Sequence, residues 1–336
     1  MLSKNIGLKK HLPLLIALSL LTLVIFLFTT SELKPTNREL KIIDDLLKQV
    51  NNPANNNSEQ RMATIKNIKT RLDDIQSKYA KHPNFYLLKA RYCLLENKKS
   101  VTNTEGKVVN PSDIDGLAHI KKAKTLITAS DPSTKDEFTK TELTLFEARF
   151  LLRLNEPQKT LEVLRTLWDN NPTIPHAALI MSQAHYKLSS LEKNKEKEHL
   201  NQALLFVDQA LKLVTTNITT KDKNGIETTV TETIFPNAHN HRARIRMRQK
   251  KYLDANYDLI EAIKHRPNFA VAHFNRGLCL AYLSTLYSSD PKKEESYRNE
   301  LLKEVEELRH LNPKLSLELY DNYYLNHILP KDNSSK

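Results

Sequence analysis

Residues 236–267 read PNAHNHRARIRMRQKKYLDANYDLIEAIKHRP, and they carry the clearest signal of architecture in the chain. Their apolar and small residues recur at the three- and four-residue spacing of a helix face. Pro236 stands where a helix can begin, because proline in the first turn removes no hydrogen bond. Ala243 follows seven positions later, and a side chain this small lets a neighbouring helix approach closely. The stretch therefore predicts helices that pack tightly together.

Other parts of the chain carry the same pattern. Pro83 lies seven residues before Ala90, and Pro175 lies seven residues before Ser182. An arginine comes directly after the small residue in three copies, as Arg91, Arg149 and Arg244. A bundle of unrelated amphipathic helices is the alternative, but a bundle has no reason to place prolines and small residues at matching offsets. The pattern therefore indicates internal repeats.

The quoted stretch resembles a tetratricopeptide repeat (TPR), a unit of two helices. The matching residues are Ala243 at the eighth position, Tyr252 at the seventeenth, then Ala255, Leu259 and Ala262, and Pro267 at the thirty-second. Other units match less fully, through Gly277, through Ala148 with Leu164 and Leu167, and through Ala203, Val207 and Ala210. The aromatic residue that the family carries at position four is replaced by Thr144, Ala178, His239 and His273. The resemblance implies an all-α fold over residues 59–329, a right-handed superhelical array of about five TPR-like helix pairs.

Two segments depart from the helical pattern. Residues 97–113 contain Val101, Val108 and Val109 around a Glu-Gly turn, and residues 215–235 are rich in threonine around Asn224-Gly225. Asn-Gly is the strongest short hairpin signal. We expect a β-hairpin inserted at each place. Residues 315–329 predict a terminal capping helix, and residues 330–336 a disordered tail.

The N-terminal region, residues 1–30, is strongly apolar. Residues 12–28 carry no charge and, extended to residue 30, would form a helix of about 26–28 Å, close to the hydrocarbon thickness of about 30 Å. We expect a single-pass transmembrane signal anchor over residues 12–30, with a cleaved signal peptide as the alternative. Three lysines precede the apolar run and no acid does, so the positive-inside rule places the N-terminus in the cytoplasm.

This orientation places the bulk of the chain outside the cytosol. In a bacterium the anchor would lie in the inner (plasma) membrane and the bulk in the periplasm; in a eukaryote the bulk would lie in a lumen. Residues 31–58 are expected to form a juxtamembrane helix and a linker. The helix should begin near Thr36 and Glu39, which have the spacing of a capping box, and the linker contains Pro53 among asparagines.

Composition limits the function. With 5 Gly in the whole chain, the sequence lacks the glycine-rich loops that cradle phosphates. Metal-binding and nucleophile motifs are also missing, so no catalytic residue, metal ligand, cofactor or small-molecule substrate is predicted, and we expect the protein not to be an enzyme. The 2 Cys fall in apolar segments and read as core residues. The net charge of +12 favours anionic partners. For a translocated chain we expect an acidic polypeptide, an anionic envelope polymer or the membrane face itself rather than nucleic acid.

The TPR resemblance implies a binding groove lined by the first helix of each pair. Carried over to this chain, groove positions hold Arg91, Arg149, Arg153, Gln183, Tyr186, Lys187, Arg244, Arg248, Phe274 and Tyr282. The lysine and asparagine clamp of chaperone-binding members is not reproduced. The alternative is that acids of neighbouring helices, such as Glu142 or Glu147, neutralise the arginines.

These observations predict a membrane-anchored scaffold that binds a protein or peptide and assists secretion, folding or assembly of a complex in the cell envelope. One alternative is a receptor whose basic groove takes an anionic polymer or an acidic polypeptide. A second alternative is an enzyme with an unrecognised site.

Overall fold

The structure is a computed structural model that describes residues 38–51, 58–96, 98, 100–102, 108–128, 137–221 and 227–324. The predicted anchor over residues 12–30 and the predicted tail over residues 330–336 lie outside these residues. No helix in the described part of the chain is long and apolar enough to span a membrane. Internal contacts divide the chain into two compact units, Met1–Pro172 with Asn217–Thr231 and Thr173–Thr216 with Glu232–Lys336.

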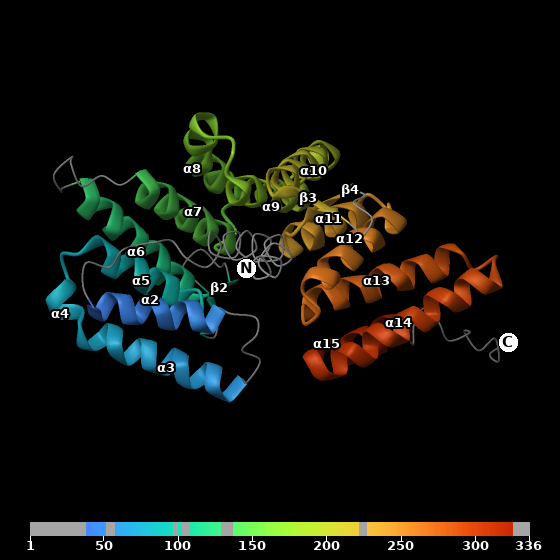
Figure 1. The fold of residues 1–336 in the computed structure, drawn as a ribbon, viewed down its shortest axis with the longest axis horizontal. Helices are drawn as coiled ribbons and strands as arrows, with labels where there is room; N and C mark the ends of the chain where they lie inside the picture. Colours follow the sequence, from blue (N-terminus) through green and yellow to red (C-terminus); the bar gives the residue numbers. More distant parts are fainter. Residues whose placement is uncertain are drawn as a thin grey trace, which may run out of the picture. The chain divides into compact units, whose positions relative to one another are not determined.

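The first unit is built mainly from helices (Figure 1). They are α2 (Arg38–Asn51), α3 (Ser58–Asp74), α4 (Gln76–Tyr79), α5 (Pro83–Cys93), α6 (Pro111–Thr128), α7 (Glu137–Arg153) and α8 (Pro157–Asn170). Helix α2 packs on α3 and α5, and α5 to α8 then pack each on the next. Leu40, Ile43 and Phe85 are buried in one core cluster, and Ile120 and Phe150 in another. Helix α2, in the region expected to be juxtamembrane, is therefore an integral part of this folded unit.

Three helix pairs and a terminal cap make up the second unit (Figure 1). The pairs are α9 (Pro175–Leu191) with α10 (Glu196–Leu213), α11 (Pro236–Arg248) with α12 (Tyr252–His265), and α13 (Ala270–Leu286) with α14 (Pro291–Leu311). A 3-10 turn, η2 (Lys193–Lys195), joins the first pair, and the cap consists of α15 (Pro313–Leu319) and the π-helical turn η3 (Tyr320–Tyr324). The cap packs on α13 and α14.

Short strands stand at the two places where the sequence departs from the helical pattern. Strands β1 (Val101–Thr102) and β2 (Val108–Val109) pair antiparallel between α5 and α6, with Val101 opposite Val109. Strands β3 (Thr215–Lys221) and β4 (Glu227–Thr233) form a second two-stranded sheet between α10 and α11.

The repeat pattern has a direct physical basis in the structure. Pro83, Pro175 and Pro236 each occupy the first turn of a helix, as the sequence predicts. The small residues that follow them at the eighth position are buried at helix contacts, as are their counterparts in other units: Ala90, Ala148, Ser182, Ala243 and Gly277. At Gly277 a Cβ would lie 2.3 Å from a methyl carbon of Leu319, so the cap packs directly against the bare backbone. The predicted small positions are therefore sites of close helix approach.

Candidate protein-binding surface

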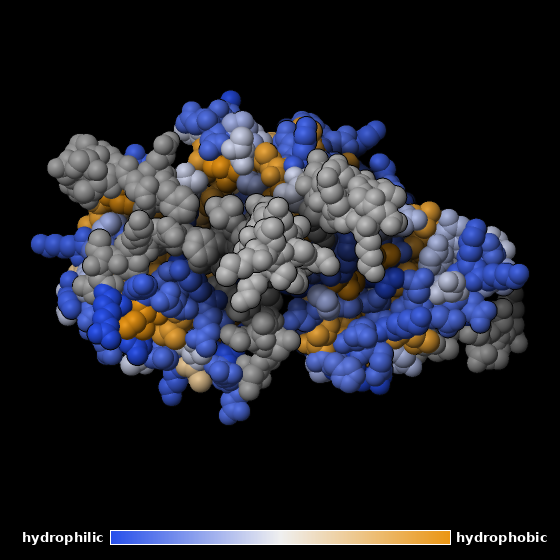
Figure 2. All heavy atoms as spheres, in the orientation of Figure 1, coloured by the Kyte–Doolittle hydropathy of each residue, from blue (hydrophilic) through white to orange (hydrophobic). Residues whose placement is uncertain are grey.

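In the second unit the first helices of the three pairs lie next to one another. Helix α11 contacts both α9 and α13, while α10, α12 and α14 are the second helices of their pairs. The groove residues that the resemblance assigns to this unit lie on α9, α11 and α13. Figure 2 shows that the visible surface of the described residues is mainly hydrophilic, with scattered hydrophobic patches. Charge and hydrogen bonding, more than apolar area, therefore distinguish one part of this surface from another.

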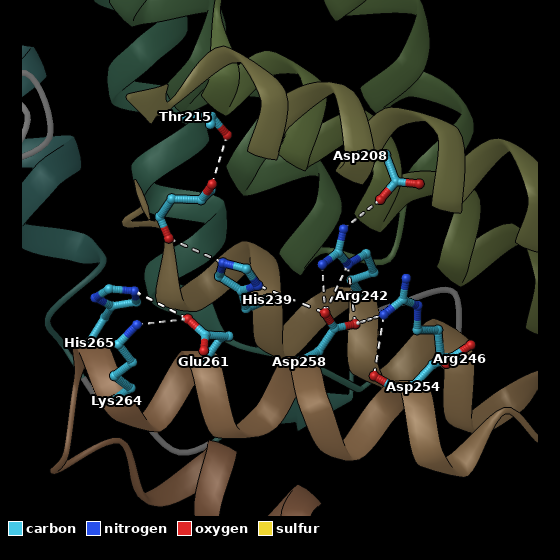
Figure 3. A network of polar contacts seen from close by, with 11 residues as sticks. Asp208, Thr215, His239, Arg242, Arg246, Asp254, Asp258, Glu261, Lys264 and His265 are labelled. Atoms are coloured by element: carbon cyan, nitrogen blue, oxygen red, sulfur yellow. Dashed lines mark hydrogen bonds and ion pairs between the residues drawn. The ribbon is translucent and has the colours of Figure 1, made fainter. Parts of the chain in front are cut away.

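Two arginines of α11 belong to an internal ionic network (Figure 3). The guanidinium group of Arg242 donates to both carboxylate oxygens of Asp258 at 2.6–3.1 Å and to Asp208 at 2.8 Å. Arg246 donates to Asp258 at 2.8 Å and to the carbonyl oxygen of Asp254 at 3.2 Å. Asp258 is only 2 % exposed. Both arginines thus hold α11 against α12, Arg242 also links α11 to α10, and the charges of both are neutralised within the chain.

Arg248, a predicted groove residue, is also used internally. Its guanidinium group donates to the hydroxyls of Ser189 at 3.0 Å and Ser190 at 2.6 Å, and to the carboxylate of Glu196 at 2.7 Å. These bonds join the C-terminal end of α11 to the end of α9 and the start of α10. The charge of Arg248 is therefore neutralised within the chain, and its assignment as a partner contact stays a prediction.

Arg244 differs from the other three arginines of α11 described above, Arg242, Arg246 and Arg248. Its side chain is exposed, and its guanidinium carbon lies 4.9 Å from the centre of the Tyr186 ring. Among the described residues it makes no ion pair with a carboxylate. A guanidinium group stacked on an aromatic face gains about 0.5–1 kcal/mol at an exposed site and keeps its N–H donors free. Arg244 is thus an ordered cation whose hydrogen-bonding capacity is directed at solvent.

The Tyr186 ring is fixed from several sides. Arg248 lies over it at 5.4 Å, and the imidazole ring of His241 meets it edge-on with 5.5 Å between centroids. His241 is buried and its Nε2 lies 3.0 Å from the hydroxyl of Ser182. Burial, with a smaller contribution from the charge of Arg244, lowers the pKa of His241 to about 3, so this ring is neutral at pH 7. Tyr186 is therefore a rigid platform beneath Arg244.

The remaining predicted groove residues of this unit differ in their burial and packing. Gln183 and Lys187 are half-buried on α9, on either side of Tyr186. Phe274 packs against the hydrophobic core, whereas Tyr282 is 39 % exposed. The ring of Tyr282 stacks on Tyr252 with 5.0 Å between centroids. We define the Tyr186 surface as Gln183, Tyr186, Lys187 and Arg244.

The three predicted groove residues of the first unit also lie in different environments. Arg91 is buried and forms an ion pair with the buried Asp44, which stabilises the contact between α2 and α5. Its assignment to a groove stays a prediction. Arg153 pairs with Asp113 at 2.6 Å. Arg149 is exposed and lies 5.8 Å from the centre of the Phe146 ring, and within the described residues it has no carboxylate partner.

Of the two acids considered from sequence, Glu147 does not neutralise an arginine. Glu147 pairs with Lys124 rather than with an arginine of the same surface. The actual partners are Asp44, Asp113, Glu196, Asp208 and Asp258. For Asp258 a sequence signal existed, because it shares the helical face of Ala255, Leu259 and Ala262, and an acid on an apolar face needs a buried cation.

Comparison with known proteins gives matches among solved structures alone. The sequence matches no family model and no curated protein. Among solved structures, the chain is similar to TTC0263, a thermophilic TPR protein of Thermus thermophilus, with a TM-score of 0.44 and 16% identity over 64% of this chain and 90% of that one. It is also similar to PilW, a widely conserved type IV pilus biogenesis factor, with a TM-score of 0.48 and 14% identity over 83% of this chain and 96% of that one.

A third similarity has the highest TM-score of these three. The APC/C hetero-tetramer Cut9-Hcn1 contains a chain that matches with a TM-score of 0.52 and 11% identity, over 82% of this chain and 42% of that one. Identities this low inform on fold alone. The paired helices and the buried small residues, together with the similarity that has a TM-score of 0.52, show that the chain has a TPR-like fold.

Proposed function

We propose that the protein is a non-catalytic, protein-interaction scaffold that binds an acidic segment of a partner protein at the Tyr186 surface. One observation carries this proposal: of the arginines at positions 242, 244, 246 and 248 of α11, only Arg244 lacks a carboxylate among the described residues. The cation is exposed and ordered by Tyr186. A carboxylate of a partner would complete the arrangement that the other three arginines already have.

The TPR-like fold supports a scaffold role, since the fold presents side chains of successive first helices on one surface. The similar chain of Cut9-Hcn1 is, by its description, part of a hetero-tetramer. The proposal also includes the anchor over residues 12–30, with the folded units on the extracytoplasmic side of the inner membrane, and a role in secretion, folding or assembly of an envelope complex. The apolar run and its preceding lysines support that part.

Binding can be tested with the full-length protein solubilised in detergent. Fluorescence anisotropy would measure its affinity for a labelled ten-residue glutamate peptide, and for a lysine peptide of the same length as the opposite-charge probe. We expect Arg244→Glu to weaken glutamate-peptide binding about 10-fold or more, since loss of a charged hydrogen bond costs about 1.5–3 kcal/mol. The matched control is Lys212→Glu, which makes the same charge change at another exposed position of the same unit.

If Arg244→Glu and Lys212→Glu weaken binding of the glutamate peptide equally, the effect is due to net charge alone, and a specific role for Arg244 is refuted. An inorganic polyphosphate probe tests the alternative of an anionic polymer. If polyphosphate binds more tightly than the glutamate peptide and loses this affinity in Arg244→Glu, the surface is a polyanion receptor rather than a peptide site. For the anchor, membrane fractions of source cells washed at alkaline pH should retain the protein, and deletion of residues 12–30 should release it.

A further inference from the structure

Two histidines of the first helix pair in the second unit face one another. His185 lies on α9 and His199 lies in the first turns of α10. Their Nδ1 atoms are 3.2 Å apart, and their ring centroids are separated by 5.5 Å with an angle of 33° between the planes. This contact is independent of the Tyr186 surface, although His185 directly precedes Tyr186 in the chain.

Each ring is held in place by a different neighbour. The His185 ring stacks on Phe206, with 5.6 Å between centroids and an angle of 9°. The Nε2 atom of His199 lies 3.4 Å from the carboxylate of Glu192. A carboxylate accepts a hydrogen bond, so it favours the proton of His199 on Nε2 and leaves a lone pair on Nδ1. That lone pair points toward the second imidazole.

The spacing of the two Nδ1 atoms fits a bound metal ion, which would need a small rotation of the rings so that both lone pairs point at one ion. Two nitrogens bound to one tetrahedral Zn²⁺ at about 2.0–2.1 Å lie about 3.3 Å apart, which the separation of 3.2 Å matches closely. A histidine ligand usually donates its other ring N–H to a carboxylate, which fixes the ring and its tautomer. Glu192 occupies that position for His199. The direct hydrogen bond between the rings uses the same two atoms, so metal binding would replace it.

We propose that the Nδ1 atoms of His185 and His199 bind one divalent transition metal ion, with water in the remaining positions. Among the residues that the structure describes, no group of three or more His, Cys, Asp and Glu side chains could hold a metal. The site therefore has two protein ligands, and it binds the metal more weakly and exchanges it more readily than a four-ligand structural zinc site. Its effect is to tie α9 to α10 directly beside the platform residue Tyr186. No spacing rule points to this pair from sequence, because 14 positions separate the two histidines.

The test uses full-length, untagged protein in detergent, stripped of metal by a chelator and then dialysed. Zn²⁺ is the probe, and an optical zinc indicator in competition measures affinity and stoichiometry at pH 7.5. We expect one site per chain, and a rise in the midpoint of thermal unfolding with added Zn²⁺, since an ion that binds only the folded state stabilises it. His185→Gln and His199→Gln should each abolish both effects. Glu192→Ala should weaken binding about 10–100-fold.

The control is His310→Gln, which removes an exposed histidine from α14 of the same unit. This variant should retain the site and the thermal shift. Circular dichroism without metal shows whether each variant is folded, and the titration of the wild-type chain is decisive even if one variant is not. Absence of a one-to-one site in the wild type, or its survival in either glutamine variant, would overturn the assignment.

Discussion

Asp258 is a buried carboxylate of the second unit that binds two arginines of α11. Its carboxylate accepts hydrogen bonds from Arg242 and Arg246, and it also lies 3.8 Å from Nδ1 of His239 (Figure 3). The Asp258 side chain is 3% exposed, whereas those of Arg242 and Arg246 are 21% and 23% exposed. Replacement by alanine would therefore leave two guanidinium groups without their buried counter-charge.

The expected cost of Asp258→Ala follows from these exposures. Removing one partner of a fully buried ion pair costs about 3–5 kcal/mol. About one-fifth of each guanidinium-bearing side chain remains in water, and Arg242 keeps its contact with Asp208, so part of that cost is recovered by hydration. We expect a loss of about 2–4 kcal/mol in the free energy of unfolding. For a unit of this size, a loss of about 3 kcal/mol lowers the melting temperature by about 6–12 °C.

Circular dichroism at the helix band, during heating and in urea, provides the measurement. Asp254→Ala is the matched control, since it makes the same change on the same helix at an exposed side chain and leaves the backbone carbonyl that Arg246 uses. Asp258→Asn, which keeps one acceptor oxygen, should fall between the two. If Asp258→Ala and Asp254→Ala destabilise the protein equally, the network contributes no net stability, and the inference from burial is refuted.

Two further changes probe packing and protonation. Gly116→Ala would place a Cβ 2.2 Å from the ring of Phe150, which is fully buried. We therefore expect urea unfolding to show a loss of about 1–3 kcal/mol in the free energy of unfolding, despite the better helix propensity of alanine. Unchanged stability would show that the ring moves freely. Burial opposes the charged form of His273, but its hydrogen bonds to the carboxylate of Glu304 and to a backbone carbonyl outweigh burial and raise its pKa. The stability from this raised pKa is fully present below about pH 6.5 and is lost as pH rises through the folded-state pKa, so the wild-type advantage over His273→Gln in urea should shrink from pH 6 to pH 9. A pH-independent difference would contradict the charged state of this ring.

Most of the helical architecture could be predicted from local sequence. Proline in the first turn and a small residue seven positions later are properties of one helix, and both were correctly placed for α5, α9 and α11. The second-helix pattern of Ala255, Leu259 and Ala262 likewise corresponds to fully buried residues. These signals are reliable because they depend on helix geometry and on steric limits that do not require knowledge of the neighbouring chain.

Local sequence could not predict which charged side chains are exposed and which are neutralised by internal ion pairs. Arg91 and Asp44 are separated by 47 positions, and Arg248 and Glu196 by 52. Whether such residues meet depends on which helices pack together and in which register. Sequence position assigned Arg244 and Arg248 to the same surface, but only the packing of α11 on α9 and α10 shows that one guanidinium is exposed and the other neutralised. Groove position alone therefore does not show which cations are already neutralised by internal ion pairs.

This distinction changes what the net charge of +12 means for recognition. A cation already paired with a carboxylate adds little to the field that a partner meets, and an added partner charge would have to compete with an existing hydrogen bond. A cationic side chain that an aromatic ring already holds in place loses little further conformational entropy when a partner binds. The partner also has no internal carboxylate to displace. Specificity in this protein should therefore reside in a few such positions, of which Arg244 on Tyr186 is the clearest in the second unit and Arg149 beside Phe146 is the counterpart in the first. Salt should weaken partner binding by the amount due to one or two charges, far less than the formal excess of the chain would suggest.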